Sequence, residues 1–207
     1  MSSGMNALER LKAGNRRFVD GDRSSANDLG PDRRRELAGA QTPFAIVLTC
    51  ADSRVAPEHV FDQGLGELFV LRVAGNIATT VVIGSIEMAV KTGASLIVVM
   101  GHSNCAAVGV TLDAVKGGED LDSPHLAAIV EHVRPAVEAS MSDLPGAEDA
   151  AVLDRAIALN VHSSVACLKQ DSELLRGLLD DGALQVVGAE YSLQTGAVEF
   201  FDEGADS

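Results

Sequence analysis

The sequence has few of the residues on which nucleic-acid-binding proteins depend. Its 207 residues include no tryptophan, one tyrosine and six phenylalanines, which leaves little for base stacking. Positive charge is also scarce, with 16 Lys+Arg against 30 Asp+Glu, and residues 111–207 hold five basic side chains against 19 acidic ones. Because such a surface repels phosphate backbones, we expect no nucleic-acid partner.

The chain has neither a long apolar run nor a recognisable export signal. The apolar stretches around residues 44–51 and 96–101 are far shorter than the roughly 20 residues that a membrane helix needs. Residues 1–18 carry charges throughout and contain no apolar segment of the kind found in secretory signals. We therefore expect a cytoplasmic protein that does not span a membrane.

Cysteine is too rare for a disulfide framework. Three cysteines, an odd number in a chain without an export signal, predict thiols that are buried, catalytic or bound to metal. No Cys-x-x-Cys pair is present, which disfavours a redox-thiol protein. Cys167 lies within a helical pattern of apolar residues, and we interpret it as a core residue.

The hydrophobic pattern predicts an α/β fold with a central, mostly parallel sheet flanked by helices. Four short apolar runs lack alternation, which is typical of strands buried on both faces, and they lie at 43–50, 67–75, 95–102 and 184–191. Helical patterns lie between them at about 79–92, 104–116, 124–141 and 148–180. A turn signal at 194–196 predicts that 197–201 returns as an antiparallel edge strand.

We predict one domain over residues 1–207. The length suits a single core, and no internal repeat, low-complexity tract or linker divides the chain. Residues 1–40 form an N-terminal helical arm, with helices over about 5–20 and 32–38, and residues 41–207 form the α/β core. The arm is basic and amphipathic, with few evident places to bury its apolar face on its own subunit.

Polar residues follow or end two of the predicted strands. Cys50, Asp52 and Arg54 come at the end of the first strand, and His102 ends the third, with Cys105 three positions later. Because ligands of an open parallel sheet bind outside the carboxyl ends of its strands, we expect these side chains to lie close together. Two thiolates, an imidazole and a carboxylate are a plausible tetrahedral set for Zn²⁺.

At these residues the sequence resembles the β-class carbonic anhydrases. The motif C-x-D-S-R stands at 50–54, and H-x-x-C stands at 102–105. Matching segments cover most of the chain: GNRRF (14–18), 41–57, LRVAGN (71–76), GSIEMAV (84–90), VVMGHSNC (98–105), NVHSSVACL (160–168) and the GALQVVGAEYSLQTGAVEF ending. The absence of tryptophan favours the plant-type subclass over the subclass with a Trp-, Arg- and Tyr-lined inhibitory bicarbonate site.

The resemblance implies one zinc ion per chain, held by Cys50, His102 and Cys105. It allows two states of Asp52: bound to zinc, which closes the site, or paired with Arg54, which frees a position for water. In the second state the implied activity is reversible hydration of CO2 to bicarbonate through zinc-bound hydroxide, rising with pH. The enzyme would be a carbonate dehydratase, which is a lyase.

The resemblance also implies a substrate pocket and an oligomer. Gln41 matches a glutamine that can hydrogen-bond substrate, whereas Phe69 and Ala74 match residues that line the CO2 pocket, often across a dimer interface. We also expect Gly101 to let the backbone pass close to the metal and substrate. Met88 departs from the tyrosine usual in plant-type members, so the family's pocket cannot be assumed there. We expect a homodimer or a dimer of dimers, with the basic arm packed on a partner.

Two alternatives use the same residues. Some members that share this site hydrolyse a related heterocumulene, carbonyl sulfide or carbon disulfide. A zinc scaffold or bicarbonate binder would instead keep Asp52 permanently on the metal. Mutation of Asp52 separates them, because an enzyme would lose turnover and keep zinc, whereas a scaffold would lose metal retention and stability.

Overall fold

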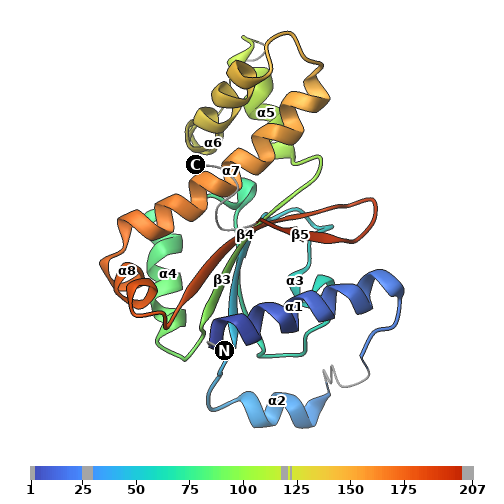
Figure 1. Ribbon diagram of the computed structural model, residues 1–207, viewed down its shortest axis with the longest axis vertical. Coiled ribbons are helices and arrows are strands. Elements are labelled where there is room, and N and C mark those ends of the chain that lie inside the picture. The colour runs from blue at the N-terminus through green and yellow to red at the C-terminus, as the bar shows by residue number, and fades with distance from the viewer. Residues whose placement is uncertain (1–2, 25–29, 118–120, 122, 202–207) are drawn as a thin grey trace.

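A five-stranded sheet with helices on both faces organises the chain (Figure 1). The computed structural model describes residues 3–24, 30–117, 121 and 123–201. In chain order the elements are α1 (Ser3–Asp20), α2 (Pro31–Leu37), β1 (Ala45–Thr49), α3 (Pro57–Val60), β2 (Leu68–Arg72), the 3-10 helix η1 (Ala74–Asn76), α4 (Thr80–Val90), β3 (Leu96–His102), α5 (Ala106–Val115), α6 (Pro124–Asp143), α7 (Asp149–Asp171), α8 (Glu173–Asp180), β4 (Gln185–Tyr191) and β5 (Val198–Phe200).

The strands are ordered β2-β1-β3-β4-β5 across the sheet. β1 pairs in parallel with β2 and β3, β3 pairs in parallel with β4, and β5 pairs antiparallel with β4. The predicted α/β class with one antiparallel edge strand is therefore confirmed. Every residue of β1 and β3 is buried, which explains why their sequences show no alternation.

Each face of the sheet is covered by its own hydrophobic cluster. On one face, Leu11 of α1 and Phe61 just after α3 pack against β1, β3 and β4. On the other face, Ile86 of α4, Val161 of α7 and Leu175 of α8 pack against the same strands. The carboxyl ends of the strands point toward a third layer formed by α5, α6 and α7 (Figure 1).

The N-terminal arm differs from the expectation. α1 buries Ala7 and Leu11 on the sheet of its own chain, so the expectation that the arm has few places to bury its apolar face on its own subunit was wrong for this helix. Packing of the arm on a partner stays a prediction. The guanidinium Nε of Arg17 lies 2.6 Å from the fully buried carboxylate of Asp62 and fastens the end of α1 beside α3. α2, in contrast, has no buried residue.

Two further differences concern helices. The pattern at 148–180 forms two helices, because Ser172 has an extended backbone (φ −118°, ψ 112°) and its side chain accepts a hydrogen bond from the N–H of Leu175. Ser172 thereby caps α8. α3 was not predicted, since its four residues, which begin at Pro57, are too few to show a helical period.

Among the residues described, α7 alone is long and apolar enough to cross a membrane by length and composition. Val161 and Leu168 are fully buried against the sheet, and Ile157 is buried against α5 and α6. The hydrophobicity of α7 is accounted for by its position as a core helix.

Candidate metal centre

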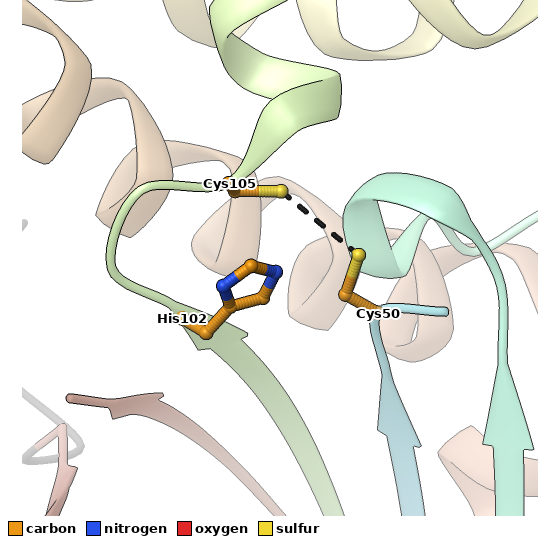
Figure 2. A group of neighbouring side chains, drawn as sticks. All are labelled: Cys50, His102 and Cys105. Carbon is orange, nitrogen blue, oxygen red and sulfur yellow. Dashed lines mark hydrogen bonds between the residues drawn. The ribbon is translucent and has the colours of Figure 1, made fainter. Parts of the chain in front are cut away.

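Two neighbouring buried strands bring two thiols and an imidazole together at the carboxyl edge of the sheet. Cys50 follows β1, His102 ends β3, and Cys105 immediately precedes α5, so that the three side chains converge (Figure 2). The sulfurs of Cys50 and Cys105 are 4.0 Å apart. The donor atoms of all three residues lie within 4.8 Å of one another, and all three residues are buried.

The imidazole of His102 is oriented as a ligand. Its Nδ1 lies 2.9 Å from the carbonyl oxygen of Ser103, which places the ring proton on Nδ1 and leaves a lone pair on Nε2. Nε2 is buried, makes no hydrogen bond of ordinary geometry to the described residues, and faces the two sulfurs (Figure 2). A buried polar atom without a partner is costly, and a cation at this position would satisfy it.

The donor set fits zinc. Tetrahedral zinc with Zn–S bonds of about 2.3 Å places two sulfur ligands about 3.8 Å apart, and the separation between the Cys50 and Cys105 sulfurs is 4.0 Å. Thiolate donors select zinc over magnesium or calcium. Cys50, His102 and Cys105 would hold the ion, and three protein ligands leave one tetrahedral position for chemistry.

The two thiols are electrostatically coupled. A hydrogen bond from Cys105 outweighs burial and holds the pKa of Cys50 well below its usual range, and the backbone N–H groups of Gly75 and Asp52 act in the same direction. The same hydrogen bond raises the pKa of Cys105, since a second negative charge beside Cys50 is unfavourable. Without a metal the pair thus carries one negative charge, and a bound cation would allow both sulfurs to ionise.

Asp52 is paired with Arg54 and does not belong to the donor group. Its carboxylate accepts hydrogen bonds from Arg54 Nη2 at 2.7 Å, from Arg54 Nε at 2.9 Å and from the Arg54 backbone N–H at 2.9 Å. These bonds to the guanidinium hold the pKa of Asp52 well below its usual range. Of the two arrangements that the sequence allowed, the structure shows Asp52 on Arg54.

The short helix η1 supports the site from the side. Gly75 and Asn76 have φ angles of 72° and 45°, in the left-handed region that favours glycine and tolerates asparagine. Their carbonyl oxygens accept hydrogen bonds from Asn160 Nδ2 at 2.7 Å and from Ser164 Oγ at 3.1 Å, both on α7. α7 therefore fixes the backbone that directs the Gly75 N–H toward Cys50.

The predicted substrate residues are not all near the metal donors. Gln41 is exposed and precedes the amino end of β1, whereas Cys50 follows its carboxyl end. Phe69 pairs with Ile46 across the β1–β2 ladder and packs into the core cluster. Within one chain, Gln41 and Phe69 therefore lie away from the three metal donors.

Ala74 and Gly101 lie closer to the centre. Ala74 borders an apolar pocket of about 210 Å³ between η1, α5 and α6, and Ala106, the residue after Cys105, lines the same pocket. A Cβ atom on Gly101 would lie 2.7 Å from Val161 Cγ2, so the packing of β3 against α7 requires glycine there. The structure gives Gly101 a packing role, and its contact with substrate stays a prediction.

Sequence reasoning missed three side chains that hold the backbone around the donors. Asn160 and Ser164 bond to η1, and Arg72 bonds to the carbonyl oxygens of Cys50 and Asp52. Their only signal in the sequence was their position inside the matching segments 71–76 and 160–168. A hydrogen bond to a backbone carbonyl has no pattern of spacing by which it could be found.

Comparison with known proteins places this site in a family. A family model described as carbonic anhydrase matches residues 45–198, which include all three donors. Carbonic anhydrase 2 of Mycobacterium tuberculosis is 41% identical over 192 residues, covering 92% of this chain and 89% of the relative. The solved structure of the β-carbonic anhydrase CcaA superposes with a TM-score of 0.75 at 24% identity, covering 95% of both chains. This chain belongs to the β-carbonic anhydrase family.

Other members of the family agree in sequence and fold. The carbonic anhydrase of Mycolicibacterium smegmatis is 41% identical over 198 residues, covering 93% of this chain and 91% of the relative. A β-carbonic anhydrase of Coccomyxa, solved in complex with acetazolamide, is 27% identical with a TM-score of 0.72, covering 93% of this chain and 85% of that one. Membership of the β-carbonic anhydrases confirms, at the level of the family, the predicted class of carbonate dehydratase.

Proposed function

We propose that this chain catalyses the reversible hydration of CO2 to bicarbonate and a proton, with one zinc ion as its cofactor. The observation that carries this proposal is the buried, unpaired Nε2 of His102, which faces the sulfurs of Cys50 and Cys105. Zinc, when bound there, is a Lewis acid that lowers the pKa of a water molecule from 15.7 to about 7, so that a nucleophile forms at neutral pH.

Asp52 would orient the attacking water. Three hydrogen bonds from Arg54 fix the carboxylate, and its lowered pKa keeps it ionised throughout the neutral range. While paired with Arg54, the ionised carboxylate would accept a hydrogen bond from the attacking hydroxide and direct an oxygen lone pair at the carbon of CO2. The proton released in the reaction must then leave for the solvent.

The pocket beside Ala74 suits an apolar substrate. Its lining consists of alanine, valine, leucine and isoleucine side chains from η1, α5 and α6: Ala74, Ala106, Ala107, Val110, Leu126, Ile129 and Val130. CO2 has no hydrogen-bond donor and no net charge, so an apolar wall next to Cys105 accommodates it without the desolvation cost that polar groups carry. The same lining would admit carbonyl sulfide or carbon disulfide.

The pair of Asp52 and Arg54 also forms the proposed gate. If Asp52 turned from Arg54 to the metal, it would fill the fourth position and close the site. That movement breaks the three hydrogen bonds from Arg54, which favour the open arrangement. Since ionisation of the water makes it a stronger competitor for the position, higher pH favours the open arrangement as well.

The proposed oligomer is a homodimer that assembles along the β2 side of the sheet. The outer edge of β2 has no neighbouring strand among the described residues. On α4, Val81 and Met88 are 79% and 70% exposed and stand two helical turns apart on one face. Two crystal structures of β-carbonic anhydrases from Sordaria macrospora, 20% identical to this chain with a TM-score of 0.74, are described as tetrameric. Replacement of Val81 and Met88 by lysine should shift the sedimentation coefficient to that of a monomer.

A dimer would also explain Gln41. Because Gln41 lies at the opposite end of β1 from Cys50, a contact between this glutamine and substrate requires the site of a second copy. A Gln41→Ala substitution should then raise KM in the dimer and leave zinc content unchanged. A Gln41→Ala protein with unaltered kinetics would argue against this contact.

The decisive experiment is stopped-flow CO2 hydration on zinc-quantified protein from about pH 6.5 to 9, which brackets the pKa of about 7 expected for the activated water. Rapid turnover with one zinc per chain, rising toward alkaline pH, is the expected result. A flat profile would contradict the proposed gate. Zinc-loaded protein with no hydration above the buffer background would contradict the function, and assays with carbonyl sulfide and carbon disulfide would then separate hydrolysis from a zinc scaffold.

A further inference from the structure

The side chain of Arg72 links β2 to the segment that follows the end of β1. It ends β2 opposite Thr49, the last residue of β1, and the Val73 N–H donates to the Thr49 carbonyl at 3.1 Å. The chain after Thr49 leaves the sheet. There Arg72 Nε donates to the Cys50 carbonyl at 3.2 Å, and Arg72 Nη2 donates to the Asp52 carbonyl at 2.5 Å. One guanidinium thus bonds to two carbonyls of the segment that follows β1.

We propose that Arg72 is a positioning residue for the metal centre. Arg72 fixes the main chain of residues 50–52, so that the Cys50 sulfur is held in place and only the side chain of Asp52 can turn. The metal-holding part of this inference is independent of the reaction that the site performs. The part that concerns Asp52 rests on the proposed function.

The chemistry of arginine suits this position. A guanidinium presents several N–H donors in a rigid plane, so two carbonyl oxygens two residues apart can be bonded at once, whereas a lysine ammonium is a point donor on a flexible stem. Arg72 forms no ion pair in the part of the chain that the structure describes, and its guanidinium bonds to the backbone carbonyls of Cys50 and Asp52. Its side chain is also exposed.

The two carbonyls belong to the two residues whose positions matter most. Cys50 supplies a metal donor, and its Cα–Cβ direction follows from its backbone. Asp52 is held on its other side by Arg54, and its carbonyl also accepts from the Val55 N–H at 3.0 Å. With the main chain clamped by Arg72, exchange of Asp52 between Arg54 and the metal becomes a side-chain rotation. Partners of this kind around metal ligands typically change metal affinity or activity by roughly 10- to 100-fold when removed.

The test compares Arg72→Met and Arg72→Lys with the matched control Arg134→Met. Arg134 lies on α6, and its ion pairs are with Glu131 and Glu138 of the same helix. For each zinc-loaded protein, the rate of zinc release to a chromogenic chelator and the values of kcat and KM are measured, with and without guanidinium at low millimolar concentration. We expect Arg72→Met to release zinc roughly 10- to 100-fold faster, Arg72→Lys to be intermediate, and Arg134→Met to behave as the parent.

Rescue by guanidinium identifies the role. Because the side chain is exposed, free guanidinium can enter the space left in Arg72→Met, and it should slow zinc release and restore part of kcat without changing the control. Unaltered zinc release in Arg72→Met would overturn the proposal. Faster release that guanidinium does not reverse, together with an equal loss of thermal stability, would also overturn it in favour of a purely structural role.

The readouts also separate this inference from the proposed function. If the parent protein binds zinc but does not hydrate CO2, the proposed function fails. Faster zinc release from Arg72→Met that guanidinium reverses would still support the positioning role of Arg72. If the parent hydrates CO2 and Arg72→Met keeps both zinc and kcat, the proposed role of Arg72 is wrong and the proposed function is supported.

Discussion

The chain contains two cysteine–aspartate pairs, Cys50 with Asp52 and Cys167 with Asp171, in which the carboxylates bond to different groups. At the metal centre Asp52 is held by Arg54, and the pKa of Cys50 lies well below its usual range. In α7 the thiol of Cys167 donates to Asp171 at 2.9 Å, and burial together with that carboxylate raises the pKa of Cys167 to about 11. At Cys167 the carboxylate of Asp171 adds to the effect of burial, whereas at Cys50 the hydrogen bond from Cys105 outweighs burial.

The position of each cysteine in its element explains those surroundings. Cys50 and Cys105 stand where a strand has ended or a helix begins, and there backbone N–H groups of Gly75, Asp52, Ala107 and Val108 are available to favour an ionised sulfur. Cys167 lies in the last part of α7, four residues before its end, where backbone N–H groups already bond within the helix. It packs against the core cluster, as predicted.

Removal of one cysteine from each pair should give the largest contrast. We expect Cys50→Ala to lose zinc and to lower kcat/KM by at least about 1000-fold, because the metal supplies several kcal/mol of charge stabilisation. Cys167→Ala should keep one zinc per chain and full turnover, at a cost of about 1 kcal/mol in stability. Metal analysis and stopped-flow hydration measure both. Full zinc content in Cys50→Ala would refute the assignment of this ligand.

Exchange of each aspartate for asparagine should give the next largest contrast. Asp52→Asn keeps the shape of the side chain but loses the charge that pairs with Arg54, so we expect turnover to fall about 100-fold with zinc retained. Asp171→Asn should leave turnover unchanged. Loss of both zinc and stability in Asp52→Asn would instead indicate that Asp52 is a ligand, as in the scaffold alternative.

The smallest expected effect concerns the reactivity of Cys167. In zinc-loaded protein, alkylation by iodoacetamide should occur at Cys167 and accelerate as pH rises toward about 11. Because this pKa is raised above the usual 9.0, the neutral thiol contributes stability below about pH 9, and that contribution is lost as pH rises through about 11. Asp171→Asn should make alkylation at pH 9 a few-fold faster, measured by peptide mass spectrometry, since the carboxylate that raises the pKa is gone. An unchanged rate would show that burial alone sets this pKa.

The sequence predicted those features that arise from a local pattern. The continuous apolar runs of β1 and β3 predicted buried parallel strands, and this in turn placed Cys50 and His102 at one edge. The turn at 194–196 predicted β5. The ion pair of Asp52 and Arg54 is one of the two states that the resemblance to the family implied.

Features that depend on packing between distant segments were not predicted. The sequence of α1 shows an apolar face but not which surface receives it, and the structure places Leu11 on the sheet of its own chain. The glycine at 101 is required by Val161, 60 positions away in the chain, and no local rule encodes that approach. The bonds from Asn160 and Arg72 to backbone carbonyls are of the same kind.

The order of the strands has a consequence for how the protein is made. β3 and β4 are neighbours in the sheet, yet residues 103–184 separate them, and closing so long a loop is a slow, entropically costly step in folding. The three donors at 50, 102 and 105 all precede most of that segment. During synthesis from the N-terminus they therefore leave the ribosome before α7 exists. The support around the donors is therefore completed late in synthesis, when Asn160 bonds to the Gly75 carbonyl.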